Sequence, residues 1–526
     1  MSGSAPQTLP PQAAVTGSHT RRWWTLGALA LSLLIISLDL TILNVALPTM
    51  ATDLHASTSD LQWFANAYNL VLSIVLLPAG LLGDRFGRKK LLIGALALFG
   101  LASAACAWST TSGQLIASRA VLALGAGFVM ILAIAMVPVL FSDEERPKAI
   151  GMVSTANFIG IPLGPIVGGW LLDHFWWGSV FLINVPLIAI AVVVVSLGVP
   201  ETRSVERPRI DLGGILTSSV GLCALSYSAI KAGESGWGNS VTLSCLAAGV
   251  VLLVGFVLLQ TKASRPLVDL SLFRSPSFTW GTILATLLSF AMFGLLFVLP
   301  QYLQAVLGAS ALRTGLFILP TVFGMIIGVQ VSEKTGPRTG AKANVALGYF
   351  LVATGMIIGT FTTTSSGYGM LITWSAIVGL GMGFALPAAM DAALGALSRD
   401  RAGVGSAVVM SSRQVGGTLG VAILGTVLNS GYRSHLPLAG LPAVAVNAAR
   451  RSVPAGIAVA QKMNSTSFLH SVRHAFTEAM GSTLWVCGSV ALASVLLALF
   501  FLPRGLATAA EEAPEKPREH AVRRAG

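Results

Sequence analysis

The feature that most constrains this chain is a series of long apolar stretches separated by short, basic connections. About 20 apolar residues in a helix cross the roughly 30 Å hydrocarbon core of a bilayer. By this measure the sequence predicts fourteen membrane-spanning helices, at residues 25–48, 61–82, 91–108, 113–140, 150–171, 180–199, 211–230, 240–260, 278–303, 313–331, 343–361, 369–390, 403–428 and 481–502. The expected fold class is therefore an all-α polytopic membrane protein, because helices satisfy their own backbone hydrogen bonds in lipid.

Composition excludes a water-soluble or a disordered chain. Hydrophobic residues make up 54% of the sequence and charged residues only 10%, whereas soluble domains carry roughly 25% charged residues. The net charge of +12 would point to a nucleic-acid partner in a soluble protein. Here the basic residues lie mainly between the apolar stretches, so we expect the lipid bilayer as a partner and no nucleic acid.

The basic residues also predict how the chain is oriented. If the fourteen helices are accepted, 24 of the 33 lysines and arginines fall in the connections on one side, and seven fall on the other. The positive-inside rule then places both termini in the cytoplasm, which requires an even number of spans. Fourteen spans satisfy this requirement, and so do twelve if residues 211–230 and 240–260 do not cross the membrane.

The predicted organisation has two halves. We expect a cytoplasmic tail (1–24), a first six-helix bundle (25–200), an extra two-helix insertion (201–275), a second six-helix bundle (276–503) with a long external loop (429–480), and a cytoplasmic tail (504–526). The order acid–base–x–Gly at 84–87 and again at 333–336 is a weak internal repeat. Two related halves are the architecture of a transporter with its site between them near the midplane.

Three sequence motifs carry chemistry, and the first is the glycine-rich loop after the second predicted helix. Its candidate residues, interpreted either as a conformational latch or as a positive-inside anchor, are Gly80, Gly83, Asp84, Arg85, Gly87 and Arg88.

The second motif lies in the fifth helix, where Gly160, Gly164 and Gly168 advance only about 40° per step. They form a groove that lets another backbone approach closely, and Pro165 and Gly169 extend the pattern.

The third motif places charge inside the first helix. An aspartate there costs about 2.5–3.5 kcal/mol on insertion scales, so Asp39 is expected to face a cavity or a partner. Arg119 lies within about 6 Å of the same depth and is a candidate partner, although it could also snorkel to the outer surface. Asn44, Arg413 and Asp391 are interpreted as cavity residues or structural charges, with Asp391 a candidate partner of Arg413.

Together these motifs resemble the drug:proton antiporters of the major facilitator superfamily, in particular the fourteen-helix family. Residues 80–90 resemble the signature loop of the superfamily, residues 160–169 its antiporter motif, and residues 38–48 and 181–186 the family motifs of helices 1 and 6. Arg119 falls at the arginine of the helix 4 motif, although Leu122 and Ala123 depart from that motif. The resemblance covers about residues 25–502 and implies two six-helix bundles with two extra central helices.

The resemblance also implies a function. It implies proton-driven export of lipophilic compounds from the cytoplasm of a bacterium. We therefore predict a proton-coupled antiporter that exports lipophilic drugs or antibiotics across the bacterial plasma membrane, with Asp39 and Arg119 in proton coupling. A buried Asp39 would be able to bind and release a proton near neutral pH, and the alternative is a structural aspartate that accepts hydrogen bonds from the nearby backbone. The alternatives are a proton-coupled importer of a small metabolite on the same fold and a non-transporting membrane sensor. We expect no enzyme activity, no cofactor and no metal site, because no catalytic or metal-ligand spacing occurs. A monomer with a lipophilic small-molecule substrate and protons as partners is expected.

Overall fold

The computed structural model describes residues 19–142, 144–202, 211–263, 266–395, 397, 399–438 and 441–503, and these form helices and no strands. The elements are α1 (His19–Asp53), α2 (Thr58–Phe86), α3 (Arg88–Ala107), α4 (Ser112–Leu140), α5 (Arg146–His174), α6 (Ser179–Leu182), α7 (Asn184–Gly198), α8 (Leu212–Ser235), α9 (Ser240–Lys262), η1 (Leu270–Arg274), α10 (Pro276–Gln301), η2 (Tyr302–Val306), α11 (Ala311–Thr360), α12 (Tyr368–Leu394), α13 (Arg399–His435), α14 (Ala443–Ala449), α15 (Val453–Lys462) and α16 (Thr466–Phe501).

The helices match the predicted membrane architecture. Among the described residues, twelve helices are long and apolar enough to cross a membrane, and α2 makes thirteen when it is counted across a 55° bend near Pro78. Proline removes a backbone donor and bends a helix at such a point. The remaining predicted segment corresponds to α5, a helix of 29 residues that packs against α1 and α11. The all-α fold class is therefore confirmed.

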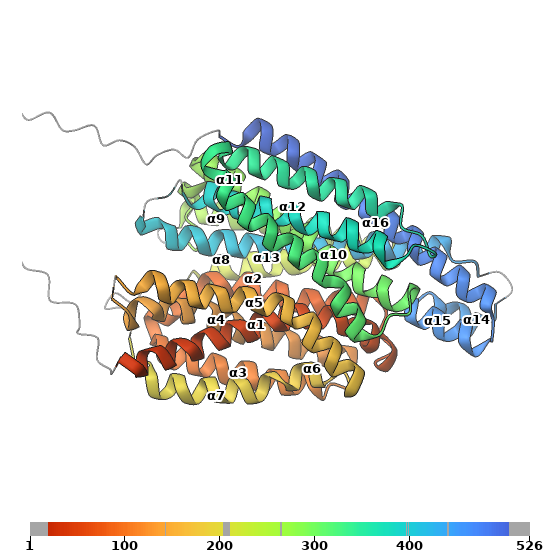
Figure 1. Ribbon diagram of the computed structural model, residues 1–526, viewed down its shortest axis with the longest axis horizontal. Coiled ribbons are helices and arrows are strands. Elements are labelled where there is room, and N and C mark those ends of the chain that lie inside the picture. Colours follow the sequence, from red (N-terminus) through yellow and green to blue (C-terminus); the bar gives the residue numbers. More distant parts are fainter. Residues whose placement is uncertain are drawn as a thin grey trace, which may run out of the picture.

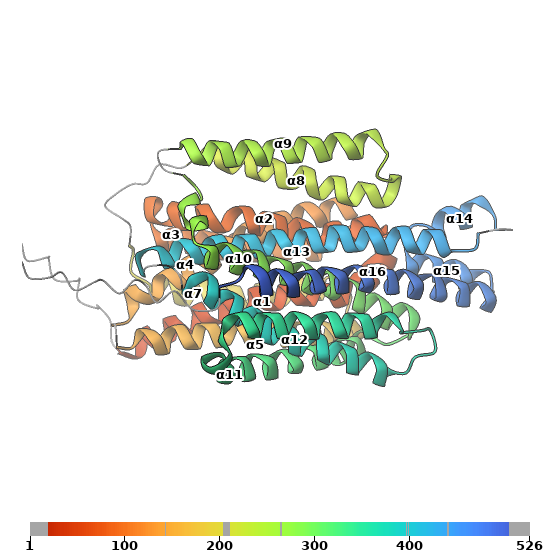
Figure 2. The same cartoon turned by 90° about the horizontal axis from the view of Figure 1, so that it is seen from above.

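The helices form two groups and one separate hairpin. Helices α1 to α7 lie together, and α10 to α13 lie together with α16 (Figure 1). Helices α8 and α9 stand as a hairpin on one side of the molecule (Figure 2), where α8 packs against α2 and α13. Only 11% of the most apolar stretch of α9 is buried inside the protein. Helix α9 packs mainly against α8, and much of its remaining apolar surface is exposed, as expected for a helix that faces lipid.

The two ends of the bundle differ. Helix α1 begins and α16 finishes at one end, which we call the terminal end, whereas α14 and α15 lie at the opposite end, called here the loop end (Figure 1). Capping residues fix where helices start at these ends. At the loop end, for example, the Ser57 hydroxyl accepts a hydrogen bond from the Asp60 N–H and the Asp60 carboxylate accepts one from the Ser57 N–H, which begins α2.

Several helix boundaries differ from those expected. The loop predicted at 429–480 is much shorter, because α13 continues to His435 and α16 begins at Thr466, with α14 and α15 between them. The first turns of α16 are polar, so hydropathy does not reveal them, and they begin at the capping residue Ser465. The stretch predicted at 180–199 is two helices, with Asn184 beginning the longer one.

The internal repeat has a different register from the one predicted. Gly87 separates α2 from α3 with φ at 106°, and the equivalent break inside α11 is Gly340, with φ at 79°. Glycine favours these left-handed conformations because it lacks a Cβ atom. Gly87 therefore corresponds to Gly340 and not to Gly336, and Pro337 stands in the second copy where Asp84 stands in the first.

Candidate functional site

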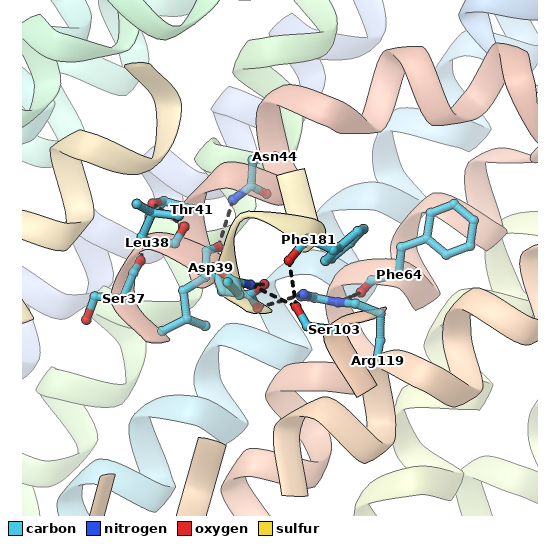
Figure 3. Close-up of polar contacts among 11 residues, drawn as sticks. Ser37, Leu38, Asp39, Thr41, Asn44, Phe64, Ser103, Arg119 and Phe181 are labelled. Atoms are coloured by element: carbon cyan, nitrogen blue, oxygen red, sulfur yellow. Dashed lines mark hydrogen bonds and ion pairs between the residues drawn. The ribbon is translucent and has the colours of Figure 1, made fainter. Parts of the chain in front are cut away.

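A buried ion pair joins α1 to α4. An Nη1 atom of Arg119 lies 2.9 Å from an Oδ2 atom of Asp39, with side-chain exposures of 2% and 0% (Figure 3). The Arg119 Nε–H also donates to the Phe64 carbonyl of α2 at 3.2 Å. The structure thus brings together the two residues that the sequence offered as partners. Snorkelling of Arg119 is excluded, because its charged head is buried.

Further polar and aromatic groups surround this pair. Asn184 donates from Nδ2 to the Asp39 Oδ1 atom at 3.3 Å and to the Ser103 hydroxyl at 3.0 Å, and Ser103 donates to the Phe181 carbonyl at 2.9 Å. The Arg119 guanidinium lies over the Tyr68 ring, 4.5 Å from its centroid. A ring face attracts a cation, so Tyr68 stabilises the buried Arg119 charge.

The pair lies wholly within the first group of helices. Its contacts come from α1, α2, α3, α4 and the α6–α7 segment, and both charges are desolvated. Removing one partner of a buried pair typically costs about 3–5 kcal/mol, since the other charge is left uncompensated. A structural change that separated Asp39 from Arg119 would therefore leave two unpaired buried charges, at a large cost in free energy.

The glycine motif of α5 faces α1 rather than the second group of helices. A Cβ atom on Gly160 would lie 2.5 Å from the Leu34 carbonyl oxygen, and one on Gly164 would lie 2.8 Å from the Leu38 oxygen and collide with the Thr41 hydroxyl. Gly168 faces Ile42 in the same way. The groove therefore holds α1 against α5 on both sides of Asp39 in the sequence.

The end of the motif has a different neighbour. A Cβ atom on Gly169 would lie 2.6 Å from the Ala311 carbonyl oxygen of α11, and Pro165 directly contacts Gly315 of α11 through its carbonyl. Thus α5 packs on α1 with one face and on the second group of helices with another. The motif therefore contacts both α1, on either side of Asp39 in the sequence, and α11 of the second group.

Asp173 fastens the two groups together at the loop end. Its carboxylate, at the end of α5, accepts hydrogen bonds from the Ser310 hydroxyl at 2.9 Å, the Ala311 N–H at 3.1 Å and the Leu312 N–H at 3.3 Å. These groups form the start of α11, whose free N–H groups and dipole favour a negative charge. Asp173 therefore acts as a helix cap supplied by the opposite group.

Other contacts close the loop end as well. The Arg451 carbonyl, between α14 and α15, accepts from the Thr58 N–H at 2.9 Å and from its hydroxyl at 3.1 Å. The Gln304 amide donates to the Val45 carbonyl at 2.8 Å, and Gln62 donates to the Ala422 carbonyl at 2.9 Å. Most of the hydrogen bonds described between the two groups therefore lie at the loop end and hold it together, although the Ser411 hydroxyl of α13 also donates to the Ser73 carbonyl of α2 midway along the helices, at 2.5 Å.

The glycine-rich loop lies at the terminal end and binds within its own group. Asp84 pairs with Arg88 at 2.7 Å, and the Arg88 Nη1 atom also reaches the Ala135 carbonyl of α4 at 3.4 Å. Gly87 faces the Glu201 carboxylate, which accepts the Lys89 N–H at 3.2 Å. The carboxylate that pairs with Arg88 therefore belongs to the same loop and not to a neighbouring one.

Of the remaining residues of this loop, Gly83 allows close packing, Gly80 has ordinary contacts, and Arg85 is exposed. Gly83 faces the Leu132 side chain of α4, whereas Gly80 leaves ordinary contact distance to Ile131. The Arg85 guanidinium lies 5.5 Å from the centroid of the exposed Phe86 ring. These contacts fit an anchored turn between α2 and α3.

The structure separates Arg413 from its expected partner. Arg413 donates from Nε to the Ser289 hydroxyl of α10 at 3.2 Å, whereas Asp391 is exposed at the terminal end of α12. The pairing of these two residues is therefore wrong. Asn44 is buried and donates to the Leu40 carbonyl of its own helix at 3.3 Å.

The family model described as Major Facilitator Superfamily matches residues 29–421. The chain belongs to this superfamily. It is therefore a multi-span membrane transporter by family and not a member of an enzyme family.

Named relatives cover almost the whole chain. The chain is 33% identical to the "Tetracenomycin C resistance and export protein" of Streptomyces glaucescens over 92% of each protein. It is 33% identical to the "Methyl viologen resistance protein SmvA" of Salmonella typhimurium over 90% of this chain and 96% of the relative. It is 32% identical to the "Multidrug efflux pump LfrA" of Mycolicibacterium smegmatis over 91% of this chain and 96% of the relative.

Solved structures share the fold. A bacterial homolog of the human lysosomal transporter Spinster, in an inward-facing and occupied conformation, matches with a TM-score of 0.66 at 16% identity, covering 94% of this chain and all of that one. A D-xylose-proton symporter matches with a TM-score of 0.60 at 15% identity, covering 92% of this chain and 98% of that one. At such identities the likeness supports the fold alone.

Asp173 was not identified from the sequence, and Asn184 was included only as part of the motif at residues 181–186, without a role of its own. Two sequence features mark this contact. Asp173 follows shortly after the glycine motif at 160–169, and Ser310 is a residue type that commonly begins a helix, here α11. A cap supplied by another helix has no local pattern, because its two parts lie far apart in the chain.

Proposed function

We propose that the protein is a proton-coupled antiporter that exports lipophilic drugs or antibiotics across a bacterial plasma membrane by alternating access. The observation that carries the proposal is the buried Asp39–Arg119 pair. Asp39 lies on α1 between the residues that pack against the glycine face of α5. The names of the relatives, which describe resistance, export and multidrug efflux, support the class of substrate.

The pair offers a way to couple a proton to a conformational change. A change that moves α1 relative to α4 separates Asp39 from Arg119 and leaves a carboxylate that a proton can neutralise. When the pair forms again, the guanidinium displaces that proton. If substrate favours the paired state and a proton favours the separated state, the two ligands disfavour each other, which is the thermodynamic basis of exchange.

We propose that residues 25–200 and 276–503 are the two bodies that rock against each other, within a single monomer. The inserted hairpin at 201–275 should move with the second body. In support, Thr426 of α13 donates to the Ala229 carbonyl of α8 at 2.7 Å, and Asn429 donates to the Gly233 carbonyl at 3.1 Å. Helix α2 would then slide along the hairpin.

We propose that both termini are cytoplasmic, so that the loop end faces outward. The basic residues of the Gly80–Arg88 loop lie at the terminal end, and they support this orientation because basic residues favour the cytoplasmic side. The contacts of Asp173 and Arg451 would then hold the outward-facing end closed. The structure then represents the state that is closed to the outside. The glycine-rich loop, with its Asp84–Arg88 pair, would act as a turn that stiffens the cytoplasmic ends of α2 and α3.

Inverted membrane vesicles test direction and coupling together. Respiration acidifies their interior, and a lipophilic compound added outside reaches the cytoplasmic face of the protein. We expect the compound to accumulate and the internal pH to rise at the same time. Vesicles carrying the Asp39→Asn/Arg119→Gln double variant are the control. Accumulation without any movement of protons would contradict the proposal.

A further inference from the structure

A positive charge lies deep in the second group of helices. Arg413 is the fifteenth residue of α13, about 21 Å along the helix from its start at 1.5 Å per residue. Gly416 and Gly420 bring the backbone of α13 against the Thr286 and Phe290 carbonyls of α10, and the Arg413 Nε–H donates to Ser289 across this contact. The side chain is thus fixed in position by α10.

No carboxylate balances this charge within the described part of the chain. Asp39 is fully engaged with Arg119 and Asn184, and Asp391 lies exposed at the terminal end. Ser289 bonds only the Nε–H, so the two Nη groups of Arg413 have no partner among the described residues. The adjacent Gln414 carries a buried Oε1 atom that also lacks a partner there.

The charges deep in the membrane therefore do not cancel. Among the residues that the structure describes, the charges of Asp39 and Arg119 cancel, so Arg413 leaves a net charge of +1. An isolated cation is costly in a medium of low dielectric constant and attracts a counter-ion strongly there. A guanidinium with free Nη groups binds a planar anion such as a carboxylate through two parallel hydrogen bonds.

We propose that Arg413 is a specificity-determining residue that binds the acidic group of an anionic or zwitterionic lipophilic substrate. This inference rests on the proposed function and names the substrate class of the same transport route. Lipophilic dications are disfavoured, because they bring further positive charge to a site that is already positive.

A matched series of pyrene compounds tests the charge preference. The probes are 1-pyrenebutyrate, its neutral methyl ester and a pyrenebutyl trimethylammonium salt, which share one apolar body. Binding is measured on the full-length protein in nanodiscs of zwitterionic lipid, by energy transfer from tryptophan to pyrene. We expect the wild type to bind the anion most tightly and the cation most weakly.

Variants then assign the preference to one residue. Arg413→Gln should weaken binding of the anion about tenfold, leave the ester within about twofold and improve binding of the cation. Arg413→Lys should retain part of the preference, and Ser289→Ala should retain most of it because the charge remains. An equal effect of Arg413→Gln on anion and ester would overturn the inference.

Two further outcomes keep the inference separate from the proposed function. If Arg413→Gln does not assemble, the wild-type order decides, and a cation that binds at least as tightly as the anion refutes the role of Arg413. If proteoliposomes transport the probes with protons but show no charge preference, only this inference fails. If they transport none of the probes or other lipophilic compounds, the proposed function itself fails.

Discussion

The Asp173 carboxylate accepts a hydrogen bond from the Ser310 hydroxyl at 2.9 Å, so the end of α5 is fastened to the start of α11 across the two groups of helices. The backbone N–H groups of Ala311 and Leu312 complete this cap. Because Asp173 is exposed, water screens these hydrogen bonds, and each contributes less than the roughly 1.5–3 kcal/mol of a well-shielded bond to a charged group. Together they stabilise the contact between α5 and α11 at the loop end.

We predict that Asp173→Asn shifts the protein toward a state that is open at the loop end. The variant keeps the size of the side chain but removes the charge that favours the start of α11. Spin labels on the exposed residues His174 and Arg313 should report a longer distance in a population at least about tenfold larger than in the wild type.

The control for this prediction is Asp53→Asn. Asp53 is an exposed aspartate at the same end, and its described hydrogen bond comes from the neighbouring Thr52 hydroxyl. The control should leave the distance distribution unchanged. Identical distributions for Asp173→Asn and the wild type would mean that other contacts, such as Thr58 with Arg451, determine closure.

Substitutions along α5 should separate its two packing faces. Gly164→Leu is expected to destabilise the fold by about 1–3 kcal/mol or more, because the new side chain meets the backbone of α1 at Leu38. Gly169→Leu should leave the first group of helices intact but hold α11 away from α5. Thermal unfolding in detergent distinguishes the two, with a lower Tm expected mainly for Gly164→Leu.

Gly151→Leu is the matched control on the same helix, since nothing lies within 4 Å of a Cβ atom there. It should keep both the Tm and transport. Gly169→Leu should impair transport through the contact between the groups while retaining most of the Tm. Equal Tm values for the Gly164 and Gly151 variants would show that α1 and α5 are less tightly packed than described.

The sequence predicted the fold well because hydropathy and lipid physics are strong, local signals. Asp39 and Arg119 were recognised as partners for a similar reason, since a charge within an apolar stretch needs compensation. The predicted Arg413–Asp391 pair is wrong because the sequence shows both charges but not the direction of their side chains. Arg413 bonds to Ser289 of α10, whereas Asp391 is exposed at the terminal end of α12. Asp173 was not identified because the position of a residue along its own helix does not show which other helix that residue contacts.

Single cysteines should establish the orientation of the chain. In a background without Cys106, Cys223, Cys245 and Cys487, we expect Val444→Cys on α14 to react with a membrane-impermeant thiol reagent added to intact cells. Lys90→Cys should react only after the membrane is opened. Both positions are exposed, so reactivity reports the side and not burial. The reverse pattern would invert the proposed orientation and the direction of transport.

The Asp39–Arg119 pair allows the sharpest test of coupling. Asp39→Asn alone leaves the Arg119 charge uncompensated in the core, so we expect a loss of about 3–5 kcal/mol of stability and poor assembly. The double variant Asp39→Asn/Arg119→Gln restores neutrality with polar groups of similar size. It should assemble far better than the single variant, as judged by gel filtration and Tm.

The double variant should nevertheless fail to concentrate substrate. It has no carboxylate to exchange a proton, so an imposed pH gradient across proteoliposomes should drive no uphill transport, although substrate binding should persist and lose its dependence on pH. Asp39→Glu retains a titratable group and should keep part of the coupling. Uphill transport at the wild-type rate by the double variant would show that the buried pair is structural and that the proton binds elsewhere in the chain.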